Sequence, residues 1–272
     1  MSKVVDKLRF SATWAFAAIT LSALLFVIFH ILSNGIQHLT PSLFEWQSNS
    51  DNVSMMPAII NTLFMVILTL LFAVPIGVFT SIYLVEYTKR GSRVVKLVRS
   101  ATEMLAGIPS IVYGLFGFIF FLGVLGTGYS LIAGSLTLTI MILPLVIRTT
   151  EEALKSVPDG YREGAFALGS GKLRSVFKVV LPSAMPGILA GVILATGRIV
   201  GETAALIFTA GTVARVASSF FDSTRTLSVH MWVLSGEGHN IPEAYATAVV
   251  LLLIVLTLNL VSAFIAKRIQ KG

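Results

Sequence analysis

The sequence from Arg148 to Leu206 reads R-T-T-E-E-A-L-K-S-V-P-D-G-Y-R-E-G-A-F-A-L-G-S-G-K-L-R-S-V-F-K-V-V-L-P and then S-A-M-P-G-I-L-A-G-V-I-L-A-T-G-R-I-V-G-E-T-A-A-L. A charged loop punctuated by glycine is followed by an apolar helix that carries Arg198 and Glu202. This order is typical of a membrane helix that follows a structured loop outside the bilayer.

The composition places most of the chain in lipid. Of 272 residues, 55% are hydrophobic and 12% are charged, and the mean hydropathy is +0.87. A soluble domain carries about a quarter charged residues. The chain has no cysteine, which excludes disulfides and thiolate chemistry.

Six stretches are long and apolar enough to cross about 30 Å of hydrocarbon, which takes roughly 20 helical residues. They cover residues 11–33, 57–85, 105–126, 128–147, 183–210 and 246–266. The first follows basic residues as a secretory signal does, but it is too long and no A-x-A-like site closes it, so we expect a retained helix. The sequence predicts an all-α integral membrane protein with six transmembrane helices.

Basic residues are concentrated on one side of the predicted membrane. Seventeen of the 20 Lys and Arg residues lie before the first span, between spans two and three, between spans four and five, or after the sixth. Because Lys and Arg are enriched in cytoplasmic loops, both termini are expected in the cytoplasm. The net charge of +7 is then explained by the membrane, and we expect no nucleic-acid partner.

Two segments on the opposite side, 34–56 and 211–245, are long enough to have a role of their own. The second contains Trp232, whose ring suits the boundary between membrane and water. Either this segment anchors the chain at the interface, or it forms a surface where an external partner delivers substrate.

Arg198 and Glu202 lie in the predicted fifth span, where a charge is costly. Four residues apart on one helix, they are able to neutralise each other. Alternatively, the Arg198 fork binds a tetrahedral oxyanion bidentately, and Glu202 holds the fork or accepts a proton from the substrate. Phosphate stays protonated near neutral pH and sulfate does not, so a carboxylate acceptor would favour phosphate. We include Thr203 with this candidate path.

Other polar residues near predicted helix ends are weaker candidates. Arg148 either anchors the cytoplasmic end of the fourth span or forms an exit station for an anion. Asn61 and Thr62 either donate hydrogen bonds to the path or have capping and packing roles.

The loop between spans four and five is predicted to contain two short helices. The first begins near Pro158-Asp159-Gly160 and ends at Gly169, which suits a left-handed cap. The second runs from about Lys172 to Val180 and is expected to stop before Pro182. The pair either lies on anionic lipid or binds a partner protein, which the small residues around Glu163 would allow to dock closely.

The motif E-G-A-x-x-x-G-x₉-V-x-L-P, from Glu163 to Pro182, resembles the EAA loop of ABC importer permeases, E-A-A-x-x-x-G-x₉-I-x-L-P. Gly164 and Val179 are mild departures. The segments 105–117, 198–206 and 227–238 are similar to the phosphate permeases of that family. The similarity extends over about residues 56–266.

This resemblance implies the type I permease fold for residues 56–272, preceded by an N-terminal transmembrane helix and external segment at 1–55. It implies a coupling helix that docks on an ATPase subunit through Glu163, Gly164, Ala165 and Gly169. It also implies four partners in a bacterial inner membrane: a second permease, an ATPase dimer, an external phosphate-binding protein and phosphate itself. ATP and Mg would be bound by the ATPase subunits, and this chain would bind no cofactor.

The residues show no sign of an enzyme. The chain has no Walker A loop, H-E-x-x-H motif or nucleophile elbow, and its four His residues lack metal-ligand spacing. A non-catalytic permease subunit for inorganic phosphate is therefore the leading interpretation. The alternatives are an ABC permease for another oxyanion, such as sulfate or molybdate, and a motor-free anion channel or secondary transporter.

Overall fold

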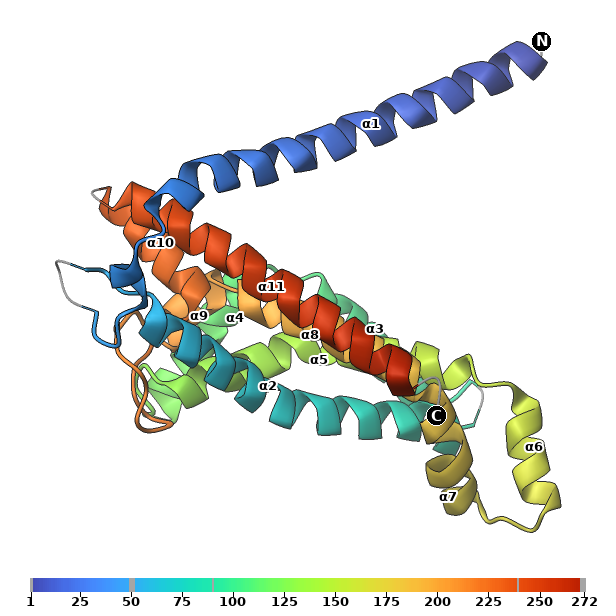
Figure 1. The fold of residues 1–272 in the computed structure, drawn as a ribbon. Helices are drawn as coiled ribbons and strands as arrows, with labels where there is room; N and C mark the ends of the chain where they lie inside the picture. The colour runs from blue at the N-terminus through green and yellow to red at the C-terminus, as the bar shows by residue number, and fades with distance from the viewer. Residues whose placement is uncertain (1, 49–51, 90, 239, 270–272) are drawn as a thin grey trace.

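A computed structural model describes residues 2–48, 52–89, 91–238 and 240–269; Arg90 and Lys271, two of the seventeen basic residues above, lie outside these ranges. The described chain is almost entirely helical (Figure 1). Its α-helices are α1 Ser2–Gly35, α2 Met56–Ile82, α3 Arg93–Ala106, α4 Ser110–Gly117, α5 Leu131–Lys155, α6 Asp159–Ala167, α7 Lys172–Ser175, α8 Leu181–Gly201, α9 Ala204–Thr209, α10 Leu227–Glu237 and α11 Ile241–Ile269. Two 3₁₀ helices (Ile36–His38, Pro41–Phe44) and three π-helical segments (Tyr83–Tyr87, Phe118–Val124, Val176–Val180) complete them.

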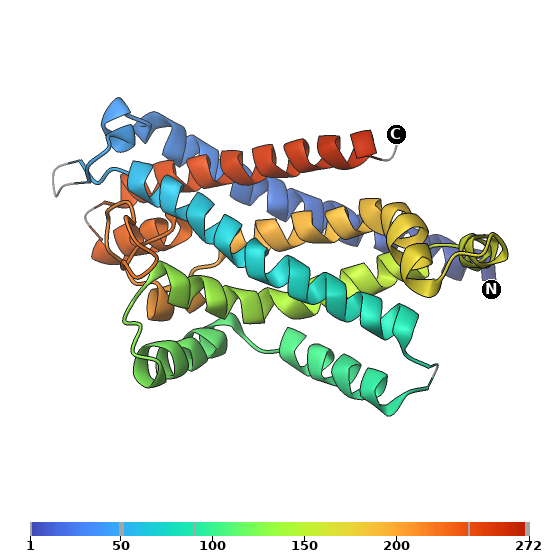
Figure 2. The same ribbon diagram turned by 90° about the horizontal axis from the view of Figure 1, so that it is seen from below.

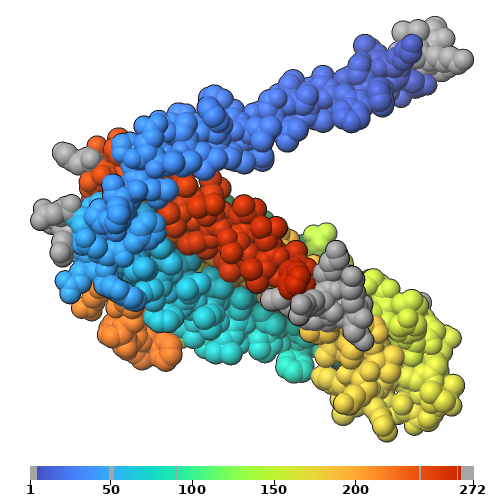
Figure 3. Space-filling view, viewed as in Figure 1, coloured from blue at the N-terminus to red at the C-terminus, as the bar shows by residue number. Residues whose placement is uncertain are grey.

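The helices form a bundle with two distinct ends. Helices α6 and α7 lie at one end, beside the C-terminal ends of α2, α5 and α11, and α10 lies at the other (Figure 1). Helix α1 contacts α11 at its C-terminal end, near Gly35, and the rest of α1 extends away from the bundle (Figure 3). Five helices, or six when α3 and α4 count as one bent span, are long and apolar enough to cross a membrane. The prediction of an all-α membrane fold is confirmed.

Helix α5 forms the centre of the bundle. It contacts α2, α3, α4, α8 and α9, and most of its residues are buried. Small residues allow this approach: a Cβ added at Gly77 of α2 would lie 2.6 Å from Val146, and one at Gly187 of α8 would lie 2.7 Å from Ala153. In lipid, where helices gain little from hydrophobic burial, such close packing is a main source of association.

The prediction of one straight helix over residues 105–126 is wrong. The chain bends by 101° between α3 and α4, at Gly107-Ile108-Pro109 (Figure 2). Pro109 has an extended backbone and precedes the first turn of α4, and the Tyr113 hydroxyl donates a 2.7 Å hydrogen bond to the Leu105 carbonyl across the bend. The G-I-P motif therefore breaks the helix.

The second short cytoplasmic helix does not stop before Pro182. The chain from Lys172 to Gly201 is one continuous helical span. Pro182 lies in the first turn of α8, directly after the π-helical segment Val176–Val180. Proline lacks an N–H and crowds the carbonyl four residues back, and wider π turns are a common way of accommodating such a break.

The predicted fifth span, 183–210, is also interrupted. Helix α8 ends at Gly201, Glu202 is extended with ψ of 130°, and α9 starts a new helix at Ala204. By contrast, the short helix predicted after Pro158 is present as α6, and Gly169 follows it with φ of +79°, the left-handed conformation expected of a C-terminal glycine.

Replacing Gly187 by Ala should destabilise the bundle. The new Cβ would meet the Cβ of Ala153, which has no rotamer to change, so α5 and α8 would have to separate at a cost of about 1–3 kcal/mol. Gly197→Ala on the same helix is the matched control, because nothing lies within 4 Å of its added Cβ. Thermal unfolding in detergent should show a lower midpoint for Gly187→Ala only; equal midpoints would contradict the packing argument.

Candidate functional site

A pocket of about 320 Å³ lies between α3, α5 and α8, and many of the residues that line it are charged. Its charged lining residues are Arg99 and Glu103 from α3, Arg148, Glu151, Glu152 and Lys155 from α5, and Arg198 from α8. Four of these side chains are basic and three are acidic, so the pocket has an excess of positive charge.

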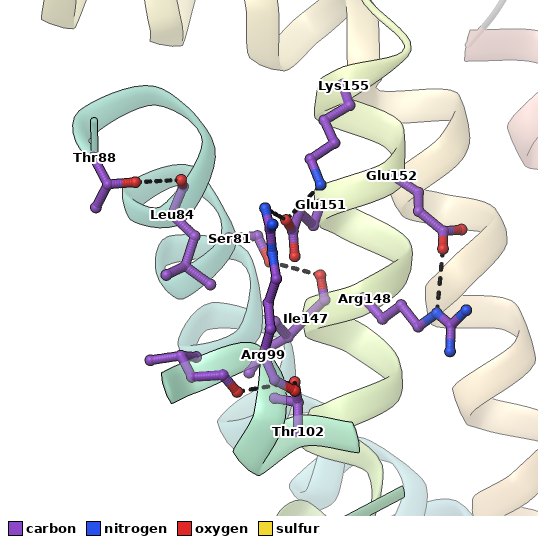
Figure 4. A network of polar contacts seen from close by, with 11 residues as sticks. Ser81, Leu84, Thr88, Arg99, Thr102, Ile147, Arg148, Glu151, Glu152 and Lys155 are labelled. Carbon is purple, nitrogen blue, oxygen red and sulfur yellow. Dashed lines mark hydrogen bonds and ion pairs between the residues drawn. The ribbon is translucent and has the colours of Figure 1, made fainter. Parts of the chain in front are cut away.

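Ion pairs join the charged residues toward the C-terminal end of α5 (Figure 4). The buried carboxylate of Glu151 accepts from Arg99 and, at 2.6 Å, from Lys155. Arg148 Nε donates to Glu152 Oε1 at 3.2 Å, and both of these side chains are largely exposed. An exposed pair of this kind contributes little stability, so Arg148 is readily available to another anion.

Arg198 is the basic residue of the pocket that stays uncompensated. Within the described part of the chain it makes no ion pair and no hydrogen bond, and its side chain is exposed on the isolated subunit. Gly187 of α8 packs on Ala153 of α5, and Gly191 packs on Thr149, so the two helices are antiparallel. Continuing the same alignment by seven residues brings Arg198 level with Ile142. That is six residues, or about 9 Å, along α5 from Arg148, near the middle of this helix.

The structure does not pair Arg198 with Glu202, which argues against the alternative in which the two residues neutralise each other. The two residues do not share a helix, because α8 ends between them. Glu202 Oε1 instead accepts the backbone N–H of Ala205 at 3.1 Å, and Ser228 Oγ donates to the Glu202 carbonyl at 2.6 Å. Both contacts stabilise the break before α9, where Thr203 is the N-cap. Places for Thr203 and for Glu202 as a proton acceptor on the substrate path stay predictions.

Asn61 and Thr62 lie at the other end of the bundle and hold the loop 211–226. Asn61 is fully buried; its amide donates to the Arg215 carbonyl at 2.8 Å and accepts from the Ala217 N–H at 3.0 Å. Thr62 Oγ1 accepts the Leu227 N–H at 2.9 Å. These contacts support the packing alternative for Asn61 and the capping alternative for Thr62, which accepts the N–H of the first residue of α10. Their contribution to a substrate path stays a prediction.

The same loop is stabilised by its own polar groups. Hydrogen bonds from the Ser218 hydroxyl and N–H, and from the Ser219 N–H, hold the pKa of Asp222 below its usual value. His230 on α10 is fully buried, and burial, together with the charge of Arg225, lowers its pKa to about 3. His230 is therefore neutral at pH 7.

Helix α6 presents part of the predicted docking set to solvent. Glu163 and Gly164 are exposed, Gly169 ends the helix, and Ala165 is buried against the chain. Leu168, with 89% of its surface exposed, stands beside Glu163 and Gly164 as an apolar contact for a partner. Docking through this face stays a prediction, and Ala165 would support it from the inside.

The pocket also contains residues that the sequence analysis did not single out. Arg99 and Glu103 belong to α3, a segment that we placed in a loop. A signal for it was present: R-V-V-K-L-V-R-S-A-T-E-M-L-A repeats apolar residues three and four apart, as an amphipathic helix does.

Comparison with protein families finds the model described as "Binding-protein-dependent transport system inner membrane component" over residues 73–272. The "Probable ABC transporter permease protein YqgI" of Bacillus subtilis is 34% identical over 99% of this chain and 97% of its own length. The "Phosphate transport system permease protein PstA 1" of Mycobacterium tuberculosis is 38% identical, and the alignment covers 71% of this chain and 64% of the relative.

Solved structures show the same fold. An inward-facing methionine ABC transporter chain superposes with a TM-score of 0.65 at 22% identity, covering 77% of this chain and 93% of that chain. A bacterial ABC transporter chain involved in the import of alginate gives a TM-score of 0.67 at 16% identity, covering 94% and 96%. The type I permease architecture is confirmed by these neighbours.

Replacing Asn61 by Ala should loosen the loop 211–226. The Arg215 carbonyl and the Ala217 N–H would lose their partner, at about 1–3 kcal/mol for buried groups left unsatisfied. Asn34→Ala is the control, because Asn34 bonds only within its own turn and to neighbouring side chains on α1. Hydrogen exchange of the loop amides should accelerate in Asn61→Ala alone; unchanged protection would show that the amide does not hold the loop.

Proposed function

The chain belongs to the family of binding-protein-dependent transport system inner membrane components, and on that basis we propose that it is the permease subunit of an ATP-driven importer of inorganic phosphate. Its relatives include phosphate transport permeases at 34–38% identity. The subunit forms the transmembrane passage together with a second permease.

The observation that carries the proposal is Arg198, an unpaired arginine level with the middle of α5, on a pocket shared with Arg148. A charge at that depth is costly unless it lines a wet path or has a partner. The guanidinium fork matches a tetrahedral oxyanion, and Arg148, about 9 Å nearer to the α6–α7 end, offers a second position after release from Glu152. Phosphate would move from the first arginine to the second.

The partners follow from the family and from the exposed face of α6. An ATPase dimer docks on Glu163, Gly164 and Leu168, and it binds the ATP and Mg, so this chain is not itself an enzyme. An external phosphate-binding protein delivers substrate at the end that carries α10. Both termini are proposed to lie in the cytoplasm, which the enrichment of Lys and Arg on that side of the predicted spans supports. Residues 1–55 and 56–272 remain the proposed division into an N-terminal helix with its external segment and the permease domain.

Radiolabelled phosphate uptake tests the proposal directly. Proteoliposomes with the assembled complex, the binding protein outside and ATP inside should accumulate phosphate, and unlabelled sulfate or molybdate should compete poorly. Strong competition by either anion would move the substrate assignment to that oxyanion. Uptake that persists without the ATPase subunits would favour a channel or secondary transporter.

Arg198→Gln should reduce uptake by at least about tenfold, because a hydrogen bond to a charged group contributes about 1.5–3 kcal/mol. Arg9→Gln removes the same charge from α1, far from the pocket, and should transport as wild type. Assembly is checked by co-purification of the ATPase subunits. Unchanged uptake in an assembled Arg198→Gln complex would remove Arg198 from the path.

Glu202→Gln should leave the preference for phosphate over sulfate unchanged. The glutamine oxygen is still able to accept the Ala205 N–H, so the break before α9 survives while the proton-accepting carboxylate is lost. A loss of phosphate preference in the competition assay would instead support the prediction from the sequence that Glu202 accepts a substrate proton.

A further inference from the structure

Arg162 of α6 points inward from the helix that carries the docking face. Its side chain is only 16% exposed. Nε and Nη2 donate to Glu86 Oε1 at 3.1 and 2.7 Å, Nη2 also donates to the Leu154 carbonyl at 2.9 Å, and Nη1 donates to the Val157 carbonyl at 2.8 Å. Arg162 therefore bonds three segments at once: α6, the chain at the C-terminal end of α5, and the end of α2.

Glu86 lies in the π-helical segment that follows α2, and its side chain is 8% exposed. A second contact reaches the next residue, because the Lys172 ammonium at the start of α7 lies 5.1 Å from the centre of the Tyr87 ring. Neighbouring residues at the end of α2 thus hold α6 and α7 separately. Ser81, one turn earlier, donates to the Ile147 carbonyl at 2.8 Å and joins α2 to α5 (Figure 4).

The chemistry of the Arg162–Glu86 pair suits the transfer of a movement of α6 to the end of α2. A guanidinium whose donors are committed to a buried carboxylate and two carbonyls has little freedom to change rotamer, and its planar fork fixes direction as well as distance. A lysine, with a single charged centre, would preserve attraction but not geometry. The nearby Asp159 contact, at 3.3 Å to an exposed carboxylate, stays within α6 and links nothing across helices.

We propose that Arg162 is a positioning residue that makes the end of α2 follow α6, so that the Arg162–Glu86 pair couples ATP hydrolysis by the partner subunits to transport. This inference rests on the proposed function, in which α6 is the element that the ATPase moves. Loss of the pair leaves α6 able to dock and the ATPase able to turn over, while α2 follows less closely.

The test is the number of phosphate ions taken up per ATP hydrolysed, measured on the complete complex in proteoliposomes. Glu86→Ala and Arg162→Lys should each lower this ratio by about threefold or more, a typical effect for a side chain that couples two sites. Glu86→Gln, which keeps a neutral acceptor, should lie between Glu86→Ala and wild type. Asp159→Asn is the matched control and should keep the wild-type ratio, because it removes only the contact of Arg162 within α6.

The ratio is taken per assembled complex, so reduced assembly does not imitate uncoupling. A wild-type ratio in assembled Glu86→Ala and Arg162→Lys complexes would overturn the inference. A wild-type complex that moves sulfate and not phosphate would contradict the substrate assignment, and the ratio would then be measured with sulfate.

Cysteine chemistry gives an independent test, because this chain has no cysteine of its own. The double variant Glu86→Cys with Arg162→Cys, combined with cysteine-free partner subunits, should be uncoupled as purified. Joining the two thiols with a bismaleimide restores a link between α2 and α6 and should raise the ratio again. Each single cysteine variant treated in the same way should remain uncoupled. No gain on cross-linking would overturn the inference.

Discussion

Close packing against α5 is the constraint on which the rest of the structure depends. Lipid gives helices little hydrophobic reason to associate, so their surfaces must fit one another closely. Gly77 brings α2 onto Val146, Gly187 brings α8 onto Ala153, and Gly117 brings α4 onto Thr137. Each contact fixes how far its helix is shifted along α5. The packing therefore sets not only stability but also the level at which every polar side chain of the bundle lies.

The positions of the charged side chains follow from how far each helix is shifted along α5. Because α8 is held at Gly187 and Gly191, Arg198 comes level with Ile142 and opens onto the same pocket as Arg148. The end of α8 at Gly201 then removes the carboxylate of Glu202 from the arginine and gives it to the Ala205 N–H. A carboxylate one turn away on the same face would have neutralised Arg198. The break before α9 is what keeps the positive charge available to an anion.

The sequence was sufficient for properties that depend on composition and on local backbone chemistry. The apolar runs predicted the membrane helices, and Gly169 ended α6 in the conformation that its position required. The sequence was insufficient to predict structure where a proline or a polar side chain is able to take either of two roles. Pro109 starts a new helix after a sharp bend, whereas Pro182 is accommodated inside a continuous one. The role of Asn61 depends on its hydrogen bond to the carbonyl of Arg215, 154 residues away, and no local sequence pattern predicts such a contact.

Helix α2 is fixed at both of its ends, which limits how the bundle is able to move. Asn61 binds the loop at one end, and Glu86, 25 residues or about 37 Å further on, binds Arg162 at the other. Between them, Gly77 and Ser81 hold α2 against α5, so α2, α5 and α6 behave as one connected unit. Helix α3 is attached differently: it follows a loop, ends at the Gly107–Pro109 bend and reaches α5 through side chains, by the Arg99–Glu151 ion pair and the apolar contact of Val95 with Ile147. Contacts between side chains rearrange more easily than backbones that pack directly on each other at glycine. Of the three walls of the pocket, α3 is accordingly the one whose movement would widen or narrow it at least cost.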